Sequence, residues 1–116
     1  LVALRRATDS RTALLYLCNP NNPTGTAVAA DVLRETCVDA AARALVVVDE
    51  AYLELADPAA TASMLPLVRE GANVVVLRTF SKIHGLAGLR VGYALAREDI
   101  AQKLRRLQMA TPNTLG

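Results

Sequence analysis

The sequence has 116 residues, about the size of one domain, which is large enough to bury a core but small for a complete enzyme built around a wide parallel sheet. Hydrophobic residues make up 53% of the chain and aromatic residues 3%, so alanine, valine and leucine must build the core, which favours a helical bundle or an α/β fold. The formal net charge is +2 and the basic residues are scattered apart from Arg105-Arg106, so nothing indicates a nucleic-acid partner.

The chain opens with a segment, Leu1 to Arg6, that lacks the order of residues found in a secretory signal. Its first residue is not Met, and no apolar stretch of the sequence approaches the length that spans a bilayer. We therefore expect an internal fragment of a soluble, cytoplasmic protein with no membrane partner.

Three short apolar runs alternate with helix-like segments along the chain. They are rich in valine and leucine and lack polar alternation, which is typical of strands buried on both faces. The runs cover residues 13–18, 44–48 and 74–77. Cys18 and Cys37 do not have the spacing of metal ligands, so we expect two reduced thiols and no metal site.

The segments between these runs have helical composition. Residues 29–41 follow directly after Val28, and Val28, Val32 and Thr36 have helical spacing, which predicts an apolar face there. Residues 65–70 predict a short helix that is closed by a glycine. Because each helix joins two strands, we expect the three strands to run parallel.

The last third of the chain breaks this alternation. Too few residues follow Thr79 to form a crossover helix before the next strand-like run, residues 89–96, so we expect that strand to be antiparallel. Residues 99–109 then predict an amphipathic helix with Ile100, Leu104 and Leu107 on its apolar face. The sequence therefore predicts an α/β fold with a mostly parallel sheet and one antiparallel strand.

A polar motif follows each of the three parallel strands. Asn19 to Gly25 follows the first, Asp49 to Tyr52 the second, and Thr79 to Lys82 the third. In open α/β sheets the carboxyl ends of parallel strands line the ligand crevice. We therefore expect the three motifs to lie close together in space.

The first two motifs each allow more than one interpretation. The segment from Asn19 to Gly25 is rich in turn formers, so it is either a tight loop that feeds the next helix or a rigid loop that aims an asparagine amide into the crevice. Asp49 directly follows four aliphatic residues, so its carboxylate is expected at the edge of an apolar sheet, where a charge requires a partner. It could cap the next segment or bind magnesium in a nucleotide hydrolase, but the sequence has no phosphate loop of the Gly-x-x-x-x-Gly-Lys-Ser/Thr type.

The third motif places Lys82 beside Thr79 and Ser81, with Arg90 a little further on. Hydroxyls, exposed backbone N–H groups and a guanidinium are the parts of a phosphate cradle. A primary amine at that place could bind an aldehyde cofactor covalently. The alternative is a solvated loop, which leaves unexplained why the lysine lies beside groups that bind anions.

These motifs resemble those of the fold-type I pyridoxal-phosphate-dependent aminotransferases. The resemblance spans residues 14–107 and rests on three segments, Asn22 to Gly25, Asp49 to Tyr52, and Ser81-Lys82 through to Arg90-Val91-Gly92-Tyr93. Within the superfamily the chain looks most like the histidinol-phosphate aminotransferase group. The resemblance implies a three-layer α/β/α sandwich in which residues 1–116 are part of the cofactor-binding large domain, with the small domain and the remaining strands outside the chain.

The resemblance also assigns candidate roles at the centre of the site. Lys82 matches the catalytic lysine, which holds the cofactor aldehyde and later moves the proton of the substrate α carbon. Asp49 matches the acid that pairs with the protonated pyridine nitrogen, an arrangement common to enzymes of this cofactor. His84 follows the lysine closely, but we expect a wall residue there without a catalytic role.

The remaining cofactor-binding candidates fall into two groups by the same resemblance. Asn22 and Tyr52 match the residues that hydrogen-bond the phenolic oxygen of the cofactor. Thr79, Ser81 and Arg90 match the set that binds its phosphate, which anchors the cofactor away from the reacting atoms. Asn113 falls where the group often has a Pro-x-Asn segment, but the surrounding residues depart from the usual aromatic form, so we assign it no role.

The implied function is the transfer of an amino group from an amino acid or histidinol phosphate to a 2-oxo acid such as 2-oxoglutarate. It further implies a cytoplasmic homodimer in amino-acid biosynthesis, such as histidine biosynthesis, whose full site needs groups outside this chain. We therefore expect the fragment alone to be inactive. Two alternatives stay open: a decarboxylase of a phosphorylated amino acid with the same cofactor, and a non-catalytic nucleotide-binding or scaffold domain in which Asp49 is structural.

Overall fold

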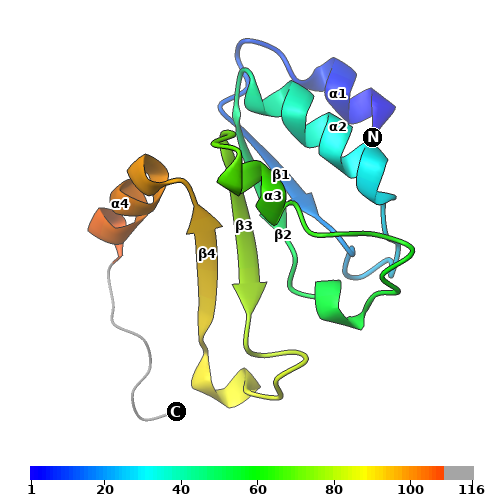
Figure 1. The fold of residues 1–116 in the computed structure, drawn as a ribbon, viewed down its shortest axis with the longest axis vertical. Helices are drawn as coiled ribbons and strands as arrows, with labels where there is room; N and C mark the ends of the chain where they lie inside the picture. The colour runs from blue at the N-terminus through cyan, green and yellow to red at the C-terminus, as the bar shows by residue number, and fades with distance from the viewer. Residues whose placement is uncertain (109–116) are drawn as a thin grey trace.

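The computed structural model describes residues 1–108 and shows a sheet with helices beside it (Figure 1). The sheet has four strands in the order β1-β2-β3-β4. They are β1 (Leu14–Cys18), β2 (Leu45–Asp49), β3 (Val74–Thr79) and β4 (Gly92–Ala96). The first three run parallel and β4 is antiparallel to β3. This confirms the predicted α/β fold with a mostly parallel sheet and one antiparallel strand.

Helices connect the parallel strands and flank the sheet (Figure 1). The α-helices are α1 (Val2–Ala7), α2 (Ala30–Ala41), α3 (Leu65–Arg69) and α4 (Glu98–Leu107), and the 3-10 helices are η1 (Leu53–Leu55) and η2 (Ala87–Leu89). The sequence predicts α2, α3 and α4, but not α1 or the 3-10 helices. None of the helices in residues 1–108 is long and apolar enough to cross a membrane.

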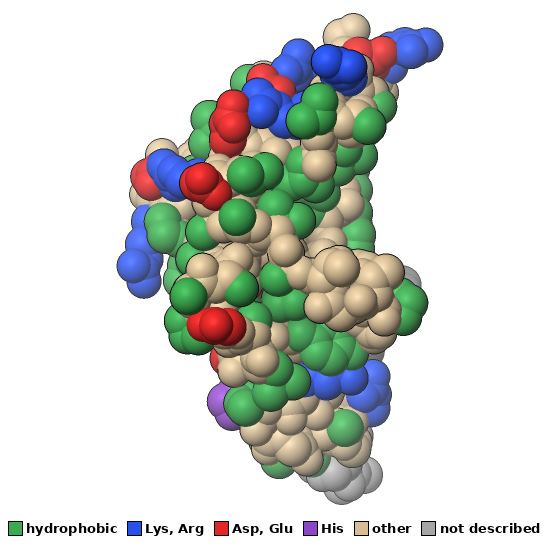
Figure 2. Space-filling view, turned by 90° about the vertical axis from the view of Figure 1, so that its right-hand side faces the viewer, with side chains coloured by type: hydrophobic (Ala, Val, Ile, Leu, Met, Phe, Trp, Pro, Cys, Tyr) green, Lys and Arg blue, Asp and Glu red, His purple; other side chains and the backbone are tan. Residues whose placement is uncertain are grey.

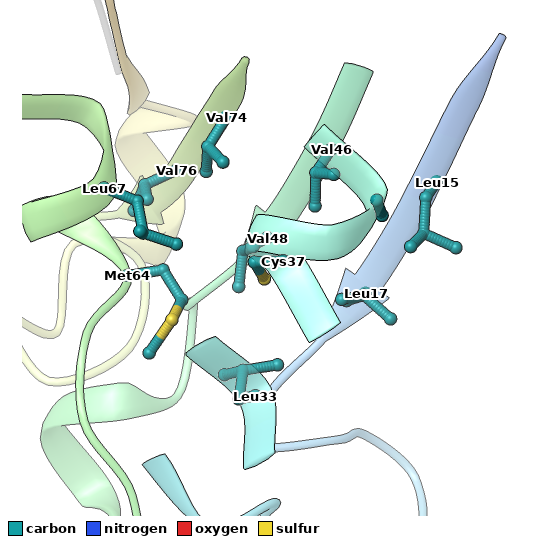
Figure 3. Close-up of a cluster of buried hydrophobic side chains, with 11 residues drawn as sticks. Leu15, Leu17, Leu33, Cys37, Val46, Val48, Met64, Leu67, Val74 and Val76 are labelled. Carbon is teal, nitrogen blue, oxygen red and sulfur yellow. The ribbon is translucent and has the colours of Figure 1, made fainter. Parts of the chain in front are cut away.

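The core lies between one face of the sheet and helices α2 and α3 (Figure 3). Side chains alternate between the two faces of a strand, so every second residue of each strand points toward these helices. The cluster of buried side chains consists of Leu15, Leu17, Leu33, Cys37, Ala40, Val46, Val48, Met64, Leu67, Val74 and Val76. Burial of the Cys37 thiol raises its pKa to about 12, so this cysteine behaves as a small apolar residue.

The buried face of α2 differs from the predicted one. Val32 is 43% exposed, whereas Leu33 and Cys37, four residues apart, are almost fully buried. Thr36, the other predicted residue of the helix, is buried and donates its hydroxyl to the Val32 carbonyl oxygen at 2.8 Å. The buried face of α2 is formed by Leu33, Thr36, Cys37 and Ala40, so it includes the predicted Thr36 but not Val32.

The apolar face predicted for α4 is only partly buried. Ile100 is 8% exposed, but Leu104 is 42% exposed and Leu107 is 75% exposed. The helix lies beside β4 at one side of the described structure (Figure 1), so only its first turn reaches the sheet. The predicted end of this helix, at residue 109, lies outside the described residues.

The face of β1 opposite the core is open. Leu14 is 51% exposed and Tyr16 is 53% exposed, while their neighbours on the other face are buried. Elsewhere on the surface, charged side chains of both signs gather at the top of Figure 2, over α1 and α2. There Arg5 pairs with Glu35 at 2.9 Å and with Asp39 at 3.5 Å. Charged pairs thus cover the outside of the helices, whereas the open face of the sheet carries the polar ends of the strands.

Candidate functional site

The polar motifs that follow the three parallel strands converge on one cavity of about 630 Å³. Its lining includes every candidate residue that the sequence predicts for the site: Asn22, Asp49, Tyr52, Thr79, Ser81, Lys82 and Arg90. The other lining residues are Tyr16, Cys18, Asn21 and Ala51. Residues that are up to 74 positions apart in the sequence, Tyr16 and Arg90, thus face the same space.

Strand geometry explains why these side chains meet. Cys18 of β1 is paired with Asp49 of β2, and Asp49 is paired with Leu77 of β3, two residues before Thr79. Side chains of paired residues and of residues two apart lie on the same face of a sheet. All four strand residues therefore point to the open face, at the carboxyl ends of the parallel strands.

The loop after β1 combines a tight turn with an aimed amide. Asn19 is buried, and its side chain accepts from the Val28 N–H at 2.7 Å and donates to Thr61 at 2.8 Å. Gly25, with a φ of 68°, closes the turn. Asn22 donates its amide N–H to the Tyr52 hydroxyl at 2.9 Å across the cavity. Both interpretations of this motif thus hold, at different asparagines.

Asp49 finds its partners on the open face. The Tyr16 hydroxyl donates to Oδ2 at 2.5 Å, and the Ala51 backbone N–H donates to Oδ1 at 3.0 Å. The hydrogen bond to the Asp49 carboxylate, together with partial burial, raises the pKa of Tyr16 to about 12. The phenol is therefore a hydrogen-bond donor at neutral pH, and the aspartate at the rim of the sheet is held at both oxygens.

The motif after β3 gathers groups that suit an anion next to an amine. The Thr79 hydroxyl accepts from the Ser81 N–H at 3.0 Å, and the Lys82 Nζ atom lies 5.0 Å from the centroid of the Tyr52 ring. Arg90 has a φ of 55°, and its Nη1 donates to the Ala87 carbonyl oxygen at 2.9 Å. A non-glycine residue in this left-handed region is uncommon, and such residues cluster at functional sites.

Two further residues named by the sequence lie apart from this cavity or from the described structure. His84 is exposed, does not line the cavity and packs against Phe80, with the ring centroids 5.4 Å apart. The absence of a catalytic role for His84 stays a prediction. Asn113 lies outside the described residues.

The structure also reveals a buried polar network on the helix side of the sheet, behind the cavity. Glu50 is 1% exposed and accepts from the Ser63 hydroxyl, the Met64 N–H and the Arg78 guanidinium, with an Arg78 Nη2 to Oε2 distance of 2.9 Å. Burial lowers the pKa of Arg78, but the hydrogen bond and the charge of Glu50 outweigh it and leave this pKa raised. Arg78 also pairs with Glu54 of η1 at 3.1 Å.

Sequence reasoning missed this network and the part played by Tyr16. Both follow from strand alternation: Tyr16 lies two residues before Cys18, on the face of Asp49, whereas Glu50 and Arg78 share the opposite face. The signal was therefore present in the spacing. An acid and an arginine at the ends of neighbouring strands, on the helix side, predict a buried pair.

Comparisons with known proteins agree on one family. A sequence model of the family described as aminotransferase class I and II matches residues 1–112. An aromatic amino acid aminotransferase from Mycobacterium bovis is 46% identical over 107 residues, which are 92% of this chain and 30% of that protein. The equivalent protein of Mycobacteroides abscessus is 49% identical over the same share of each. This chain thus spans about a third of the length of its curated relatives.

Solved structures show the same likeness. A putative histidinol-phosphate aminotransferase from Erwinia carotovora atroseptica gives a TM-score of 0.84 at 39% identity, over 97% of this chain and 32% of that one. The histidinol-phosphate aminotransferase from Sinorhizobium meliloti was solved in complex with pyridoxal-5'-phosphate. It gives a TM-score of 0.77 at 36% identity, over 94% of this chain and 28% of that one. An L-threonine-O-3-phosphate decarboxylase from Porphyromonas gingivalis gives a TM-score of 0.74 at 25% identity, over 90% of this chain and 30% of that one.

Proposed function

The chain belongs to the aminotransferase class I and II family, and from that premise we propose that the whole protein transfers amino groups from an amino acid to a 2-oxo acid. The fold agrees with this membership, since it matches the α/β fold of fold-type I enzymes. The observation that carries the proposal is that one cavity collects a carboxylate from the end of β2 and a primary amine and a guanidinium from the connection between β3 and β4. The cofactor of this chemistry is pyridoxal phosphate.

The residues present fit that cofactor in their chemistry. Lys82 offers an amine for the aldehyde, Asp49 a carboxylate for the pyridine nitrogen, and the Asn22–Tyr52 pair an amide and a phenol for the ring oxygen. The phosphate-binding set would be Thr79, Ser81 and Arg90, which supply hydroxyls and a guanidinium. When bound, pyridoxal phosphate supplies an electron sink that stabilises the charge left when the α proton of the substrate departs.

The side chains of the chain itself would then share the work of binding and proton movement. Lys82 Nζ would take and return the α proton, and the Tyr52 ring, whose centroid lies 5.0 Å from Nζ, would help to position the amine. Because Asn22 donates to the Tyr52 oxygen, the phenolic O–H is free to donate into the cavity. Arg90 and the two hydroxyls anchor the phosphate remotely, so that binding energy orients the reacting centre.

We propose further that the amino donor is an aromatic amino acid or histidinol phosphate and that the acceptor is a 2-oxo acid such as 2-oxoglutarate. Curated relatives at 45–49% identity are named for aromatic amino acids, and two solved structures at 36–39% identity for histidinol phosphate. The higher identity favours an aromatic donor. A cytoplasmic homodimer with a place in amino-acid biosynthesis, in which residues 1–116 are part of the large domain, completes the proposal.

A second candidate keeps the cofactor and changes the reaction to decarboxylation of a phosphorylated amino acid. It is supported by the likeness to the threonine-phosphate decarboxylase at 25% identity. Product analysis distinguishes the two candidate reactions when the full-length protein is incubated with glutamate and 2-oxo acids or with the phosphorylated amino acid. Only a transaminase requires the oxo-acid acceptor, whereas only a decarboxylase releases carbon dioxide from the phosphorylated amino acid.

The test of the main proposal is the Lys82→Ala variant of the full-length protein. We expect the wild-type protein to show the visible absorbance of a lysine-bound cofactor, and the variant to lose both this band and transaminase activity, because no other amine lines the described cavity. His84→Ala is the control, since His84 is outside the cavity, and it should retain both. A band that persists in Lys82→Ala, or binding of ATP without pyridoxal phosphate, would contradict the proposal.

A further inference from the structure

Tyr16 makes the shortest side-chain hydrogen bond among the residues that line the described cavity. The proposed function assigns no role to this tyrosine. Its hydroxyl donates to Asp49 Oδ2 at 2.5 Å. The two residues come from neighbouring parallel strands, where Tyr16 is paired with Val47 and so lies diagonal to Asp49 on the same face. The phenol and the carboxylate therefore meet because of the sheet register.

The bond leaves Asp49 able to accept further donors. Oδ2 accepts from Tyr16 and Oδ1 from the Ala51 N–H, so each oxygen has one partner in the chain. A carboxylate oxygen has two lone pairs, and an ionised carboxylate accepts about four hydrogen bonds in all. Two fixed donors thus set the orientation of the carboxylate and leave capacity on the side that faces the cavity.

Packing in the core does not explain why a tyrosine occupies position 16. The side chain is 53% exposed and is absent from the buried cluster, which lies on the other face of the sheet. Its hydroxyl is the group that makes the contact. The high pKa of the phenol, about 12, agrees with this geometry, since the phenol stays a donor at any pH at which the enzyme would work.

We propose that Tyr16 is a positioning residue for Asp49: its hydroxyl holds the carboxylate turned into the cavity, ready to accept the ring N–H of the cofactor. The inference rests on the proposed function, because Asp49 is the group proposed for the pyridine nitrogen. It goes beyond that function by assigning Tyr16 a role that is exerted through Asp49.

The experiment measures the dissociation constant of pyridoxal phosphate from the full-length apoenzyme. Tyr16→Phe keeps the ring and removes only the hydroxyl, and we expect it to raise this constant by about tenfold, the size expected for a hydrogen bond to a charged group. Tyr93→Phe is the matched control, because Tyr93 packs against Phe80 and does not line the cavity. It should leave the constant unchanged.

A double-mutant cycle shows whether Tyr16 acts through Asp49. In the Asp49→Asn background, Tyr16→Phe should change the dissociation constant by less than about twofold, because the carboxylate that it holds is gone. An equal change in both backgrounds would overturn the proposal, since Tyr16 would then act independently of Asp49. No change in either background would overturn it as well.

A second measurement does not depend on the cofactor. With ¹³C-labelled tyrosine in the full-length apoenzyme, NMR should show a Tyr16 signal that titrates at about pH 12. In Asp49→Asn its midpoint should fall toward the ordinary value of about 10, and an unchanged midpoint would overturn the bond itself. If the protein does not bind pyridoxal phosphate at all, the proposed function fails, while this titration still decides whether Tyr16 and Asp49 interact.

Discussion

Arg90 combines two properties that rarely occur together. Its guanidinium lines the cavity, and its backbone adopts a φ of 55°, a conformation that glycine adopts without cost. A chain selected only for a good turn would have glycine here. The arginine is retained at a cost in backbone energy, which supports a binding role for its side chain.

Replacing Arg90 by glycine should therefore raise the stability of the fold and lower its affinity for pyridoxal phosphate. Arg90→Gly should stabilise the fold by about 1 kcal/mol, the cost of a left-handed conformation for a residue with a Cβ. The same variant should bind pyridoxal phosphate at least about tenfold more weakly, because the charged hydrogen bonds to the phosphate are lost. Urea denaturation of the apoenzyme and titration with the cofactor measure the two effects in the full-length protein.

Arg90→Lys tests which property of the side chain matters. Lysine keeps the charge but not the planar fork, so we expect weaker cofactor binding with no gain in stability. Arg97→Lys is the matched control, because Arg97 pairs with Asp99 and donates to Gly71, away from the cavity. Unchanged affinity in both Arg90 variants would show that the phosphate is held elsewhere.

Three elements meet at the buried network behind the cavity. Glu50 follows β2, Arg78 belongs to β3, and Glu54 lies in η1. Asp49 and Thr79, which line the cavity, are the direct neighbours of Glu50 and Arg78 along the two strands. The network therefore fixes the relative position of the strand ends that carry the candidate site.

Loss of Glu50 should be costly, because Arg78 then keeps only the partly exposed Glu54 as a charged partner. Glu50→Ala leaves Arg78, whose side chain is 19% exposed, without its buried partner, and we expect a loss of about 3–5 kcal/mol in the free energy of unfolding. Glu54→Ala removes the other acid of Arg78, which is 34% exposed, and should cost at most about 1 kcal/mol. Urea denaturation of both variants measures the difference.

Two outcomes of that comparison are informative about the site. A stable Glu50→Ala variant would mean that Arg78 reaches water and that the pair is not a fixed connection. Equal losses in the two variants would mean that Arg78 depends on both acids alike. Only the first outcome would mean that main-chain pairing alone positions the strand ends.

The sequence predicted the strands well because their signal is local. Short valine-rich runs indicate buried strands, and the turn-forming motifs after them mark their ends. The same reasoning brought the seven candidate site residues to one cavity, since the carboxyl ends of parallel strands must share an edge. The roles of these residues remain predictions that rest on the family.

Tertiary contacts explain what the sequence did not predict. α1 has six residues and no side-chain cap, so nothing local marks it; Leu4 packs against the buried cluster, and Arg5 pairs with acids of α2. In α2 the spacing of Val32 and Thr36 fits a helix, but the helix turns so that Leu33 and Cys37 face the sheet. Periodicity fixes the type of an element more reliably than the direction of its buried face.

At the scale of the whole molecule, the open face of the sheet is the notable feature. Helices α2 and α3 cover one face, whereas β1 exposes Leu14 and Tyr16 on the other, next to the candidate site. The implied three-layer sandwich has helices on both faces, and the relatives are about three times longer than this chain. We therefore expect the rest of the protein to cover this face and to complete the cavity.

This expectation predicts opposite effects for one substitution in two contexts. In the 116-residue chain expressed alone, Leu14→Lys should reduce self-association, because an exposed apolar edge strand is an aggregation site and a lysine blunts it. In the full-length protein the same substitution should destabilise the fold by about 2 kcal/mol or more, because it places a charge in a buried layer. Sedimentation velocity of the short chain and urea denaturation of the full-length protein provide the two measurements.

Val38→Lys, at a site on α2 that is 49% exposed on the outer helix surface, is the matched control and should be nearly neutral in both. If Leu14→Lys left the full-length protein as stable as the control does, the open face of β1 would be a true surface of the enzyme, and the covering layer would have to be sought elsewhere.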